Sequence, residues 1–559
     1  MEKYFDSHLH ITMKSQFSLQ DDPTNPWSTI TFSDISEGLS FLHRCLGKAM
    51  FEKTFVSQSS PDQLLNSNYQ LAMVALFYPD KGLLKAIEQK TVFMNLLEKK
   101  QGTGFGKILS FRRFHELINE KNPIDVVRND LELLKMEDPK GRKYQLLKKK
   151  VDFDPDKNNT LNLAFTVEGL HCLASDLKGD QLANGADKTI RNLDALLEDY
   201  PIKIVSINIT HIDNSNQIFC NQAYAMDGMR ASGFREVELR PIGDGLTNEG
   251  KKIIKALEER GILTDTKHMS VVARKEFYKW RKTEGITSPI VCSHGGLTGI
   301  WFDQSDERFT DYILESRKIG EHQRFRLGKP IKYKKGKVYD QIGFNASTIN
   351  LFNEDIKEIF DSDGLLGISL DQRVLGYSGV FKTGTGHVTN NVLTGSAGIW
   401  NGINWVTDTD FVSLAECKDS GFQSNRPHGY AWRNCVDADA LDKMVNKNIN
   451  NVREIHFLHF AFHILHCMIL GRQWDSQNGV EKVLCHMLCI GSDYDGMIES
   501  ILTSKDSTQI HLLRRKFVQD FPGILKDNKV ELPKNLSIEK VANRIFFENG
   551  RDFVLKRLV

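Results

Sequence analysis

Short apolar runs alternate along this chain with longer amphipathic segments. Several of the runs carry Ile, Val, Leu and Phe on consecutive positions rather than on every second one. That pattern is typical of strands buried on both faces, as in a parallel sheet covered by helices. The predicted strands are Lys3–Ile11, Gln70–Tyr78, Leu161–Gly169, Ile202–His211, Leu263–Met269, Pro289–Gly295, Leu365–Asp371 and Met487–Asp493.

Helical patterns lie between these runs, and Asn248–Arg260 is the clearest of them. It places Ile253, Ile254 and Leu257 on one face, and Gly261 follows as a candidate C-cap. Strands that alternate with helices in this way predict an α/β protein built as a (β/α)8 barrel.

The chain is far longer than a bare barrel requires. It has 559 residues, against roughly 250 for the fold. We therefore expect one barrel domain over residues 1–559, with insertions at about 12–69, 297–340 and 372–450 and a helical extension over 500–559.

Two inserted stretches have unusual compositions. Ser316–Lys337 carries nine Lys and Arg against one Glu, and a solvated loop or edge hairpin is favoured there over a rim that steers anions. Ser378–Asp408 is rich in Gly, Thr and Asn. It is interpreted as a lid or a long irregular excursion.

Histidines and acids occur where the predicted strands end. His8 and His10 are two residues apart on the first strand and therefore face the same side. Because the carboxyl ends of barrel strands converge on one mouth, we expect these side chains to meet. The full set is His8, His10, Glu168, His211, His268, His294 and Asp493.

Imidazole and carboxylate groups in one cluster indicate a metal site. They suit zinc, and also iron, manganese or nickel. A single histidine at such a position is more often structural, but seven such side chains at six strand ends favour metal binding. A central carboxylate can bridge two cations, which hold a hydroxide and polarise a carbonyl or phosphoryl group together.

The order of the motifs resembles the membrane dipeptidase (renal dipeptidase) family of the amidohydrolase superfamily. The resemblance covers Lys3–Ile11, Leu161–Gly296 and His463–Gly496. It implies a (β/α)8 barrel with a binuclear zinc centre that hydrolyses dipeptides. The motifs that carry it are HxH, VEGLH, THxDN, GLTxxG…DTKHMS, PIVCSHG, HILH…G and IGSDYDG.

The resemblance also implies roles for individual residues. His8 and His10 match the ligands of the first metal, Glu168 the bridging carboxylate, and His268 and His294 the ligands of the second metal.

Two further positions match the catalytic groups of that family. His211 resembles the histidine that contacts substrate and stabilises the oxyanion. Asp493 resembles the acid/base that takes the proton of the bridging water and delivers it to the leaving amine. His171 and Asp495 are expected to support the loops that carry Glu168 and Asp493 without binding metal themselves.

Three departures from the family pattern concern charge and substrate recognition. The first strand has a second histidine, His10, where the family has an aspartate. No arginine follows His294 until Arg308, and Asn350 is preceded by Ile where the family has Arg-Asn. Arg373 is therefore a candidate cation for a substrate carboxylate, although a surface role is the simpler interpretation.

Four histidines in a stripe at helical spacing suggest a second metal site as one interpretation. The interpretation we favour is a buried helix whose histidines are hydrogen-bonded, and in the resemblance the last two are not ligands. The stripe consists of His456, His459, His463 and His466.

Three functional hypotheses remain open on these residues. The first is a hydrolase that cleaves the amide bond of a dipeptide or N-acyl compound with two divalent ions, zinc being favoured. The second is an ester, lactone or phosphoester hydrolase on the same scaffold. The third is a non-catalytic metal-binding relative of a dipeptidase.

The net charge and the hydropathy of the chain limit the classes of partner that we expect. The formal net charge is +1, which argues against a general nucleic-acid binder. The mean hydropathy is −0.36, and no run of the chain is long and apolar enough to predict a membrane span. The sequence shows no signal peptide, and its nine cysteines have irregular spacings, so we expect a cytoplasmic protein with free thiols. A homodimer is one candidate for the oligomeric state of this protein.

Overall fold

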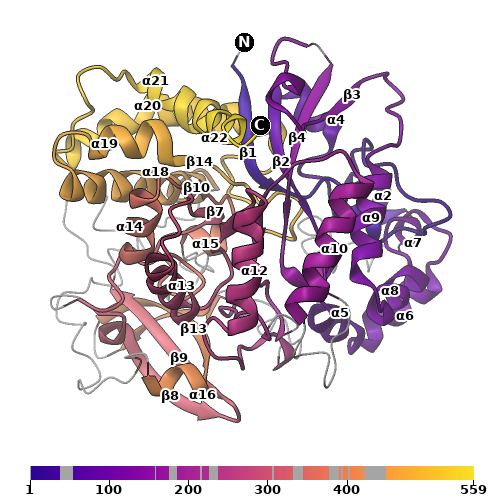
Figure 1. Cartoon of the computed structure of the whole chain (residues 1–559), viewed down its shortest axis with the longest axis horizontal. Helices are drawn as coiled ribbons and strands as arrows, with labels where there is room; N and C mark the ends of the chain where they lie inside the picture. The colour runs from indigo at the N-terminus through magenta and orange to yellow at the C-terminus, as the bar shows by residue number, and fades with distance from the viewer. Residues whose placement is uncertain are drawn as a thin grey trace.

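The fold was analysed in a computed structural model of the chain. It describes residues 2–37, 39, 55–157, 159–174, 185–214, 217–225, 237–304, 308–330, 344–376, 390–391, 395–400, 403–419, 422 and 449–558. Figure 1 shows the described chain as a barrel wrapped by helices, with a second sheet to one side.

Eight parallel strands form the barrel, in the order β1-β2-β4-β5-β6-β7-β10-β14. The ends of this sheet meet, because Leu9 forms a parallel bridge with Tyr494, and the amide of Asp493 donates to the carbonyl of His8 at 2.9 Å. The predicted (β/α)8 fold is therefore confirmed. The strands are β1 Tyr4–Leu9, β2 Tyr69–Leu76, β4 Thr160–Val167, β5 Ile204–Asn208, β6 Leu263–Asp265, β7 Val291–Gly295, β10 Leu365–Ile368 and β14 Leu488–Ile490.

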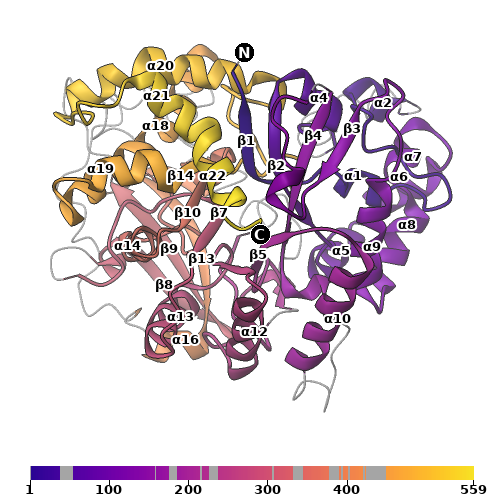
Figure 2. The same cartoon turned by 45° about the horizontal axis from the view of Figure 1, so that its top comes forward.

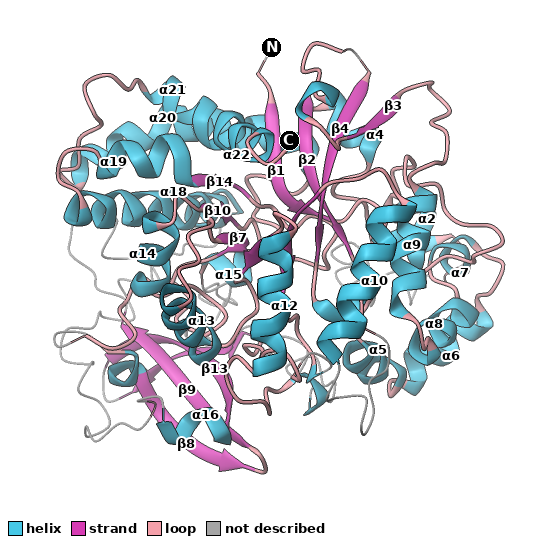
Figure 3. Ribbon diagram, viewed as in Figure 1, coloured by secondary structure: helices cyan, strands magenta, loops and turns pink. Residues whose placement is uncertain are grey.

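Helices cover the outside of the barrel between successive strands (Figure 3). The predicted helix at Asn248 is α12, Asn248–Glu259, which Thr247 caps and after which Gly261 takes a φ of 62°. Others of this layer are α10 Gly185–Asp199, α13 Val271–Thr283, α14 Asn353–Asp361, α18 Ile449–Trp474 and α19 Gly479–Lys482.

The first long insertions are helical. The segment between β1 and β2 contains α1 Met13–Gln16, α2 Phe32–Ser36 and α4 Pro61–Asn66. The segment between β2 and β4 contains α5 Lys81–Glu88, α6 Thr91–Lys99, α7 Gly104–Ile108, α8 Phe111–Asn119, α9 Pro123–Leu133 and the short strand β3 Lys143–Leu146.

An antiparallel sheet of five strands is built from two segments, one after β7 and one after β10. Its order is β11-β12-β13-β9-β8, and Figure 3 shows β8, β9 and β13 set apart from the barrel strands. The described part of Ser316–Lys337 lies in the predicted hairpin, whereas residues 331–337 lie outside the described residues. The strands are β8 Ile313–Ile319, β9 His322–Pro330, β11 Asn390–Asn391, β12 Gly395–Trp400 and β13 Ile403–Ser413.

The described part of Ser378–Asp408 is not the irregular excursion that was one of the two interpretations, because it forms strands; the lid stays a prediction. There β12 and β13 pair over Ser396–Thr407, and β13 pairs in turn with β9. This segment is rich in Gly and Thr, and its sequence shows no local strand pattern. It forms strands because β13 pairs with β9, which is distant in the sequence.

The last helices pack against the amino-terminal end of the barrel. Phe553 and Val554 of α22 join Phe5, Leu71 and Val291 in one apolar cluster, and Figure 2 shows α22 beside β1. The carboxyl-terminal helices are α20 Ile510–Asp527, α21 Ile538–Asn543 and α22 Asn549–Leu555. The barrel is therefore filled at this end by apolar side chains.

Candidate metal centre

The strand ends bring all seven predicted side chains to one end of the barrel. His8 lies in β1 and His294 in β7, whereas the other five follow their strands by one to three residues: His10, Glu168, His211, His268 and Asp493. All but Asp493 are buried. Strand β5 ends at Asn208, so His211 reaches the site from a loop rather than from the strand end that the sequence predicted.

Glu168 is the centre of the cluster. Its Oε2 lies 3.2 Å from Nε2 of His10. Its Oε1 faces four more imidazoles through their Nε2 atoms: His8 at 3.2 Å, His268 at 3.3 Å, His211 at 3.4 Å and His294 at 3.6 Å. The carboxylate thus contacts both pairs of histidines that are expected to hold different metal ions, with Oε2 facing His10 and Oε1 facing His8, His268 and His294.

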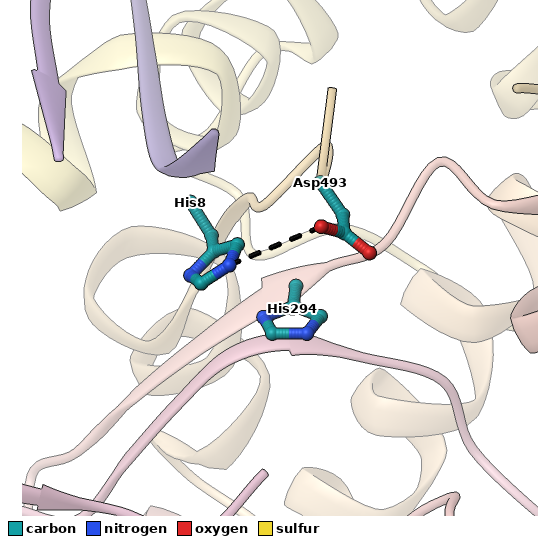
Figure 4. A group of neighbouring side chains, drawn as sticks. All are labelled: His8, His294 and Asp493. Atoms are coloured by element: carbon teal, nitrogen blue, oxygen red, sulfur yellow. Dashed lines mark ion pairs between the residues drawn. The ribbon is translucent and has the colours of Figure 1, made fainter. Parts of the chain in front are cut away.

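Asp493 approaches the same cluster from β14. Its Oδ1 lies 3.5 Å from Nε2 of His10 and 3.9 Å from Nε2 of His8. Figure 4 shows this carboxylate directed at His8, with His294 beside them. The rings of His8 and His294 have centroids 3.9 Å apart. Asp493 is the most exposed member, with 16% of its side chain accessible, so it can meet a molecule that enters from solvent.

Burial and charge act in opposite directions at these groups. Burial raises the pKa of Glu168, but His211, His8 and His10 outweigh it and hold that pKa well below its ordinary value. Burial lowers the pKa of His268 to about 3, and it holds the pKa of His294 well below its ordinary value. Both imidazoles are therefore neutral at physiological pH, which is the form that binds a metal ion.

The donor set fits divalent cations. Three overlapping groups have ligand atoms within 4.8 Å of one another: His8, His10 and Glu168; Glu168, His211 and His268; and His8, His294 and Asp493. Among the described residues, both ring nitrogens of His8 are buried without a hydrogen-bond partner. Buried nitrogens without partners are costly unless a ligand or an ion satisfies them. Histidine and carboxylate donors in such numbers suit zinc.

Two members of the cluster have strained backbones. His268 has a φ of 70° and Asp493 a φ of 63°. Such left-handed conformations cost on the order of 1–3 kcal/mol in residues other than glycine, and they persist where the surroundings hold them. Here they turn a side chain from beyond the strand end back into the barrel mouth.

Asp80 orients His211 and was missed in the sequence. Nδ1 of His211 lies 2.5 Å from Oδ2 of Asp80, so its Nε2 faces Glu168. His171, predicted to support the site, places Nε2 2.7 Å from the carbonyl of Tyr78 and 4.0 Å from Asp80. Asp80 follows the predicted second strand by two residues, and that position was the available signal.

Asp495 and Arg373 have other partners in the structure. Asp495 pairs with the buried ammonium of Lys14 and accepts from the amide of Ser59 at 3.0 Å. It therefore joins the first insertion to the loop that carries Asp493. The Nε and Nη2 atoms of Arg373 donate to both oxygens of Asp371 at 2.6–3.0 Å, so its charge is already compensated.

The histidines of the stripe lie in α18 and are buried. Nδ1 of His463 lies 2.7 Å from the carbonyl of His459, and Nε2 of His466 lies 2.8 Å from Oδ1 of Asn353. The amide of Leu502 donates to Nδ1 of His456 at 3.0 Å. These contacts agree with the interpretation of the stripe as hydrogen-bonded side chains of a buried helix.

Comparison with known proteins returns solved structures only. No family model and no curated protein matches the chain. A dipeptidase AC, described as a metallo peptidase, is 11% identical, with a TM-score of 0.43 and coverage of 100% of this chain and 99% of the other.

Two further matches are similarly distant. A metallo peptidase from Rhodobacter sphaeroides, liganded with a phosphinate mimic of L-Ala-D-Ala, is 11% identical, with a TM-score of 0.42 and coverage of 100% and 99%. The probable dipeptidase PvdM from Pseudomonas aeruginosa is 12% identical, with a TM-score of 0.39 and coverage of 100% and 96%.

Proposed function

We propose that this protein is a binuclear metal hydrolase that cleaves an amide bond in a dipeptide or N-acyl compound. The observation that carries the proposal is the position of Glu168, whose two oxygens face His10 on one side and His8, His268 and His294 on the other at 3.2–3.6 Å. A carboxylate so placed is suited to bridge two cations.

The two ions would be held by His8, His10 and Glu168, and by Glu168, His268 and His294. When bound, divalent ions of this kind, most suitably zinc, supply Lewis acidity and lower the pKa of a water molecule. The residues that hold them are neutral imidazoles apart from Glu168, so the loaded centre retains a positive charge that favours an anionic nucleophile.

Asp493 and His211 handle the proton and the developing charge. The carboxylate of Asp493 accepts the proton of the attacking water and delivers it to the nitrogen of the leaving amine as the carbon–nitrogen bond breaks. His211 is held through Nδ1 by Asp80, so its Nε2 is directed into the site, where it can hydrogen-bond the carbonyl oxygen.

A panel of substrates tests this function. Zinc-loaded protein is assayed against dipeptides, N-acyl amino acids, esters, lactones and phosphoesters, before and after removal of metal with a chelator. We expect the highest kcat/KM on an amide, loss of turnover on chelation and recovery with zinc. Turnover confined to a lactone or phosphoester, or unaffected by chelation, contradicts the proposal.

A further inference from the structure

Glu416 connects the antiparallel sheet to the loops of the barrel mouth. It lies in α16, Leu414–Asp419, directly after β13, and is 2% exposed. Its Oε1 accepts from Oγ of Ser270 at 2.5 Å and from the amide of Gly245 at 3.1 Å. One carboxylate oxygen thus joins the segment after β5 and the segment after β6 to an insertion that lies outside the barrel.

The partner of Glu416 is two residues from His268. Ser270 accepts from the amide of Ala273 as the N-cap of α13, and its own amide donates to the carbonyl of Asn221 at 2.9 Å. The carbonyl of His268 accepts from the amide of Ala223 at 2.7 Å. The loop of His268 is therefore held by residues 221–223 on one side and by Glu416 on another.

His268 requires such support because its backbone is strained. Its φ of 70° is left-handed, and a residue other than glycine keeps this conformation where the surrounding contacts determine it. The carboxylate is itself costly to bury. Burial raises the pKa of Glu416 to about 7 against the hydrogen bonds of Ser270 and Asn221.

We propose that Glu416 is a positioning residue for the metal ligand His268, and that the antiparallel sheet thereby contributes to the second metal site. This inference rests on the proposed function for the role of His268. The contact assigns the insertion a part in catalysis without placing any of its side chains against substrate.

The test compares Glu416→Ala with Glu416→Gln, which keeps an acceptor for Ser270 and Gly245. Asp410→Ala is the matched control, because Asp410 is a buried carboxylate of the same sheet that accepts from the amide of Thr348 at 2.8 Å instead. The readouts are the affinity for each zinc ion, kcat and KM, and hydrogen exchange of residues 264–270 in metal-free protein.

We expect Glu416→Ala to weaken binding of the second ion by about 10–100-fold and to leave the first ion in place. It should also speed exchange over 264–270, whereas Glu416→Gln and Asp410→Ala stay close to wild type in both respects. Unchanged exchange and affinity in Glu416→Ala, or equal losses in Asp410→Ala, overturn the inference. A wild-type protein that binds fewer than two ions contradicts the proposed function instead, and exchange in the metal-free variants still decides the role of Glu416.

Discussion

Glu168 is the residue on which the proposed chemistry depends. Its side chain is 3% exposed and is surrounded by imidazoles of which at least two, His268 and His294, are kept neutral by burial. A buried carboxylate is stable only when it is paired with positive charge. In the proposed centre metal ions supply that charge, whereas in their absence Glu168 raises the pKa of His10, against the effect of burial, to about 9.

One substitution tests the role of Asp493 in proton transfer separately from metal binding. Asp493→Asn keeps the size of the side chain and removes the group that moves the proton, so we expect both zinc ions to remain and kcat to fall by about 10²–10⁴-fold. Metal analysis and steady-state kinetics measure the two effects. Asp495→Asn, on the same loop but bonded to Ser59 and Lys14, should lower the stability of the fold and retain turnover per folded molecule. Near-wild-type kcat in Asp493→Asn contradicts the assigned role.

Two buried lysines should respond to substitution in opposite directions. Nζ of Lys267 is buried and has no hydrogen-bond partner among the described residues. Nζ of Lys14, in contrast, donates to the carboxylate of Asp495 and, at 2.5 Å, to the carbonyl of Val56. Replacing a buried ammonium that lacks hydrogen bonds with an apolar group of similar shape removes a desolvation cost. We therefore expect Lys267→Met to raise the free energy of unfolding of metal-free protein.

Breaking a buried pair has the opposite effect. Lys14→Met leaves Asp495 buried without its cation, so it should lower the free energy of unfolding by about 3–5 kcal/mol. Urea titration of both variants gives the comparison. Destabilisation of equal size in the two would show that Lys267 has compensating contacts of similar strength.

The sequence predicts much of the site because parallel strands end together. His8, Glu168 and His294 could be placed from strand ends alone, without knowledge of their contacts. The orientation of Asp80 toward His211 could not, since it depends on how the loop after β2 turns. The pairing of Arg373 with Asp371 likewise depends on a rotamer that no sequence pattern specifies.

Two glycines of the carboxyl-terminal helices differ only in what surrounds them. A Cβ on Gly550 of α22 would lie 2.0 Å from ring atoms of Phe5, whereas a Cβ on Gly523 of α20 meets nothing within 4 Å. Both substitutions by alanine gain helix propensity of up to about 1 kcal/mol. Only Gly550→Ala displaces an aromatic ring of the barrel core, which costs typically about 1–3 kcal/mol.

Thermal unfolding of the two alanine variants isolates the packing between α22 and β1. We expect Gly523→Ala to match or exceed the wild-type Tm and Gly550→Ala to fall below it. Equal Tm values would show that α22 can shift away from Phe5 without loss, and that its contact with the end of the barrel contributes little.

The strands that the sequence predicts are those with a local sequence pattern. All eight barrel strands coincide with predicted apolar runs, because burial on both faces leaves consecutive apolar residues, as in β4. The strands of the antiparallel sheet have no such signature. In β12, Gly395–Trp400, glycine and serine occupy a strand that pairs with β11 and β13.

The stability of the whole molecule should depend on pH through buried acids that are not themselves proposed metal ligands. Burial raises the pKa of Asp130 to about 7, against hydrogen bonds from Gln16, Thr12 and the amide of Phe77 and the charge of His10. The folded protein therefore holds this proton more tightly than the unfolded chain does. Its contribution is fully present at low pH and is lost as the pH rises to about 7, with a slope of up to about 1.4 kcal/mol per pH unit.

Asp130→Asn removes that dependence. Between pH 5 and 7, the free energy of unfolding of metal-free wild-type protein should fall more steeply than that of the variant, as denaturant titrations at several pH values measure. Parallel curves for the two proteins would contradict the raised pKa and place the pH dependence in other groups.

The molecule as a whole is one barrel elaborated by its insertions. The site residues run from His8 to Asp493, so the barrel spans most of the chain. Its additions include the helices after β1 and β2 and the antiparallel sheet formed by the segments after β7 and β10. In the part of the chain that the structure describes, none of the helices combines the length and apolar character that a membrane crossing requires. The seven described cysteines form no disulfide.

The central claim is that Glu168 bridges two metal ions. Anomalous diffraction at the zinc edge from crystals of the loaded protein tests it most directly. We expect two peaks about 3.5–4 Å apart, both in contact with the carboxylate of Glu168, with His8 and His10 at one peak and His268 and His294 at the other. A single peak, or a pair that Glu168 does not touch, would contradict it.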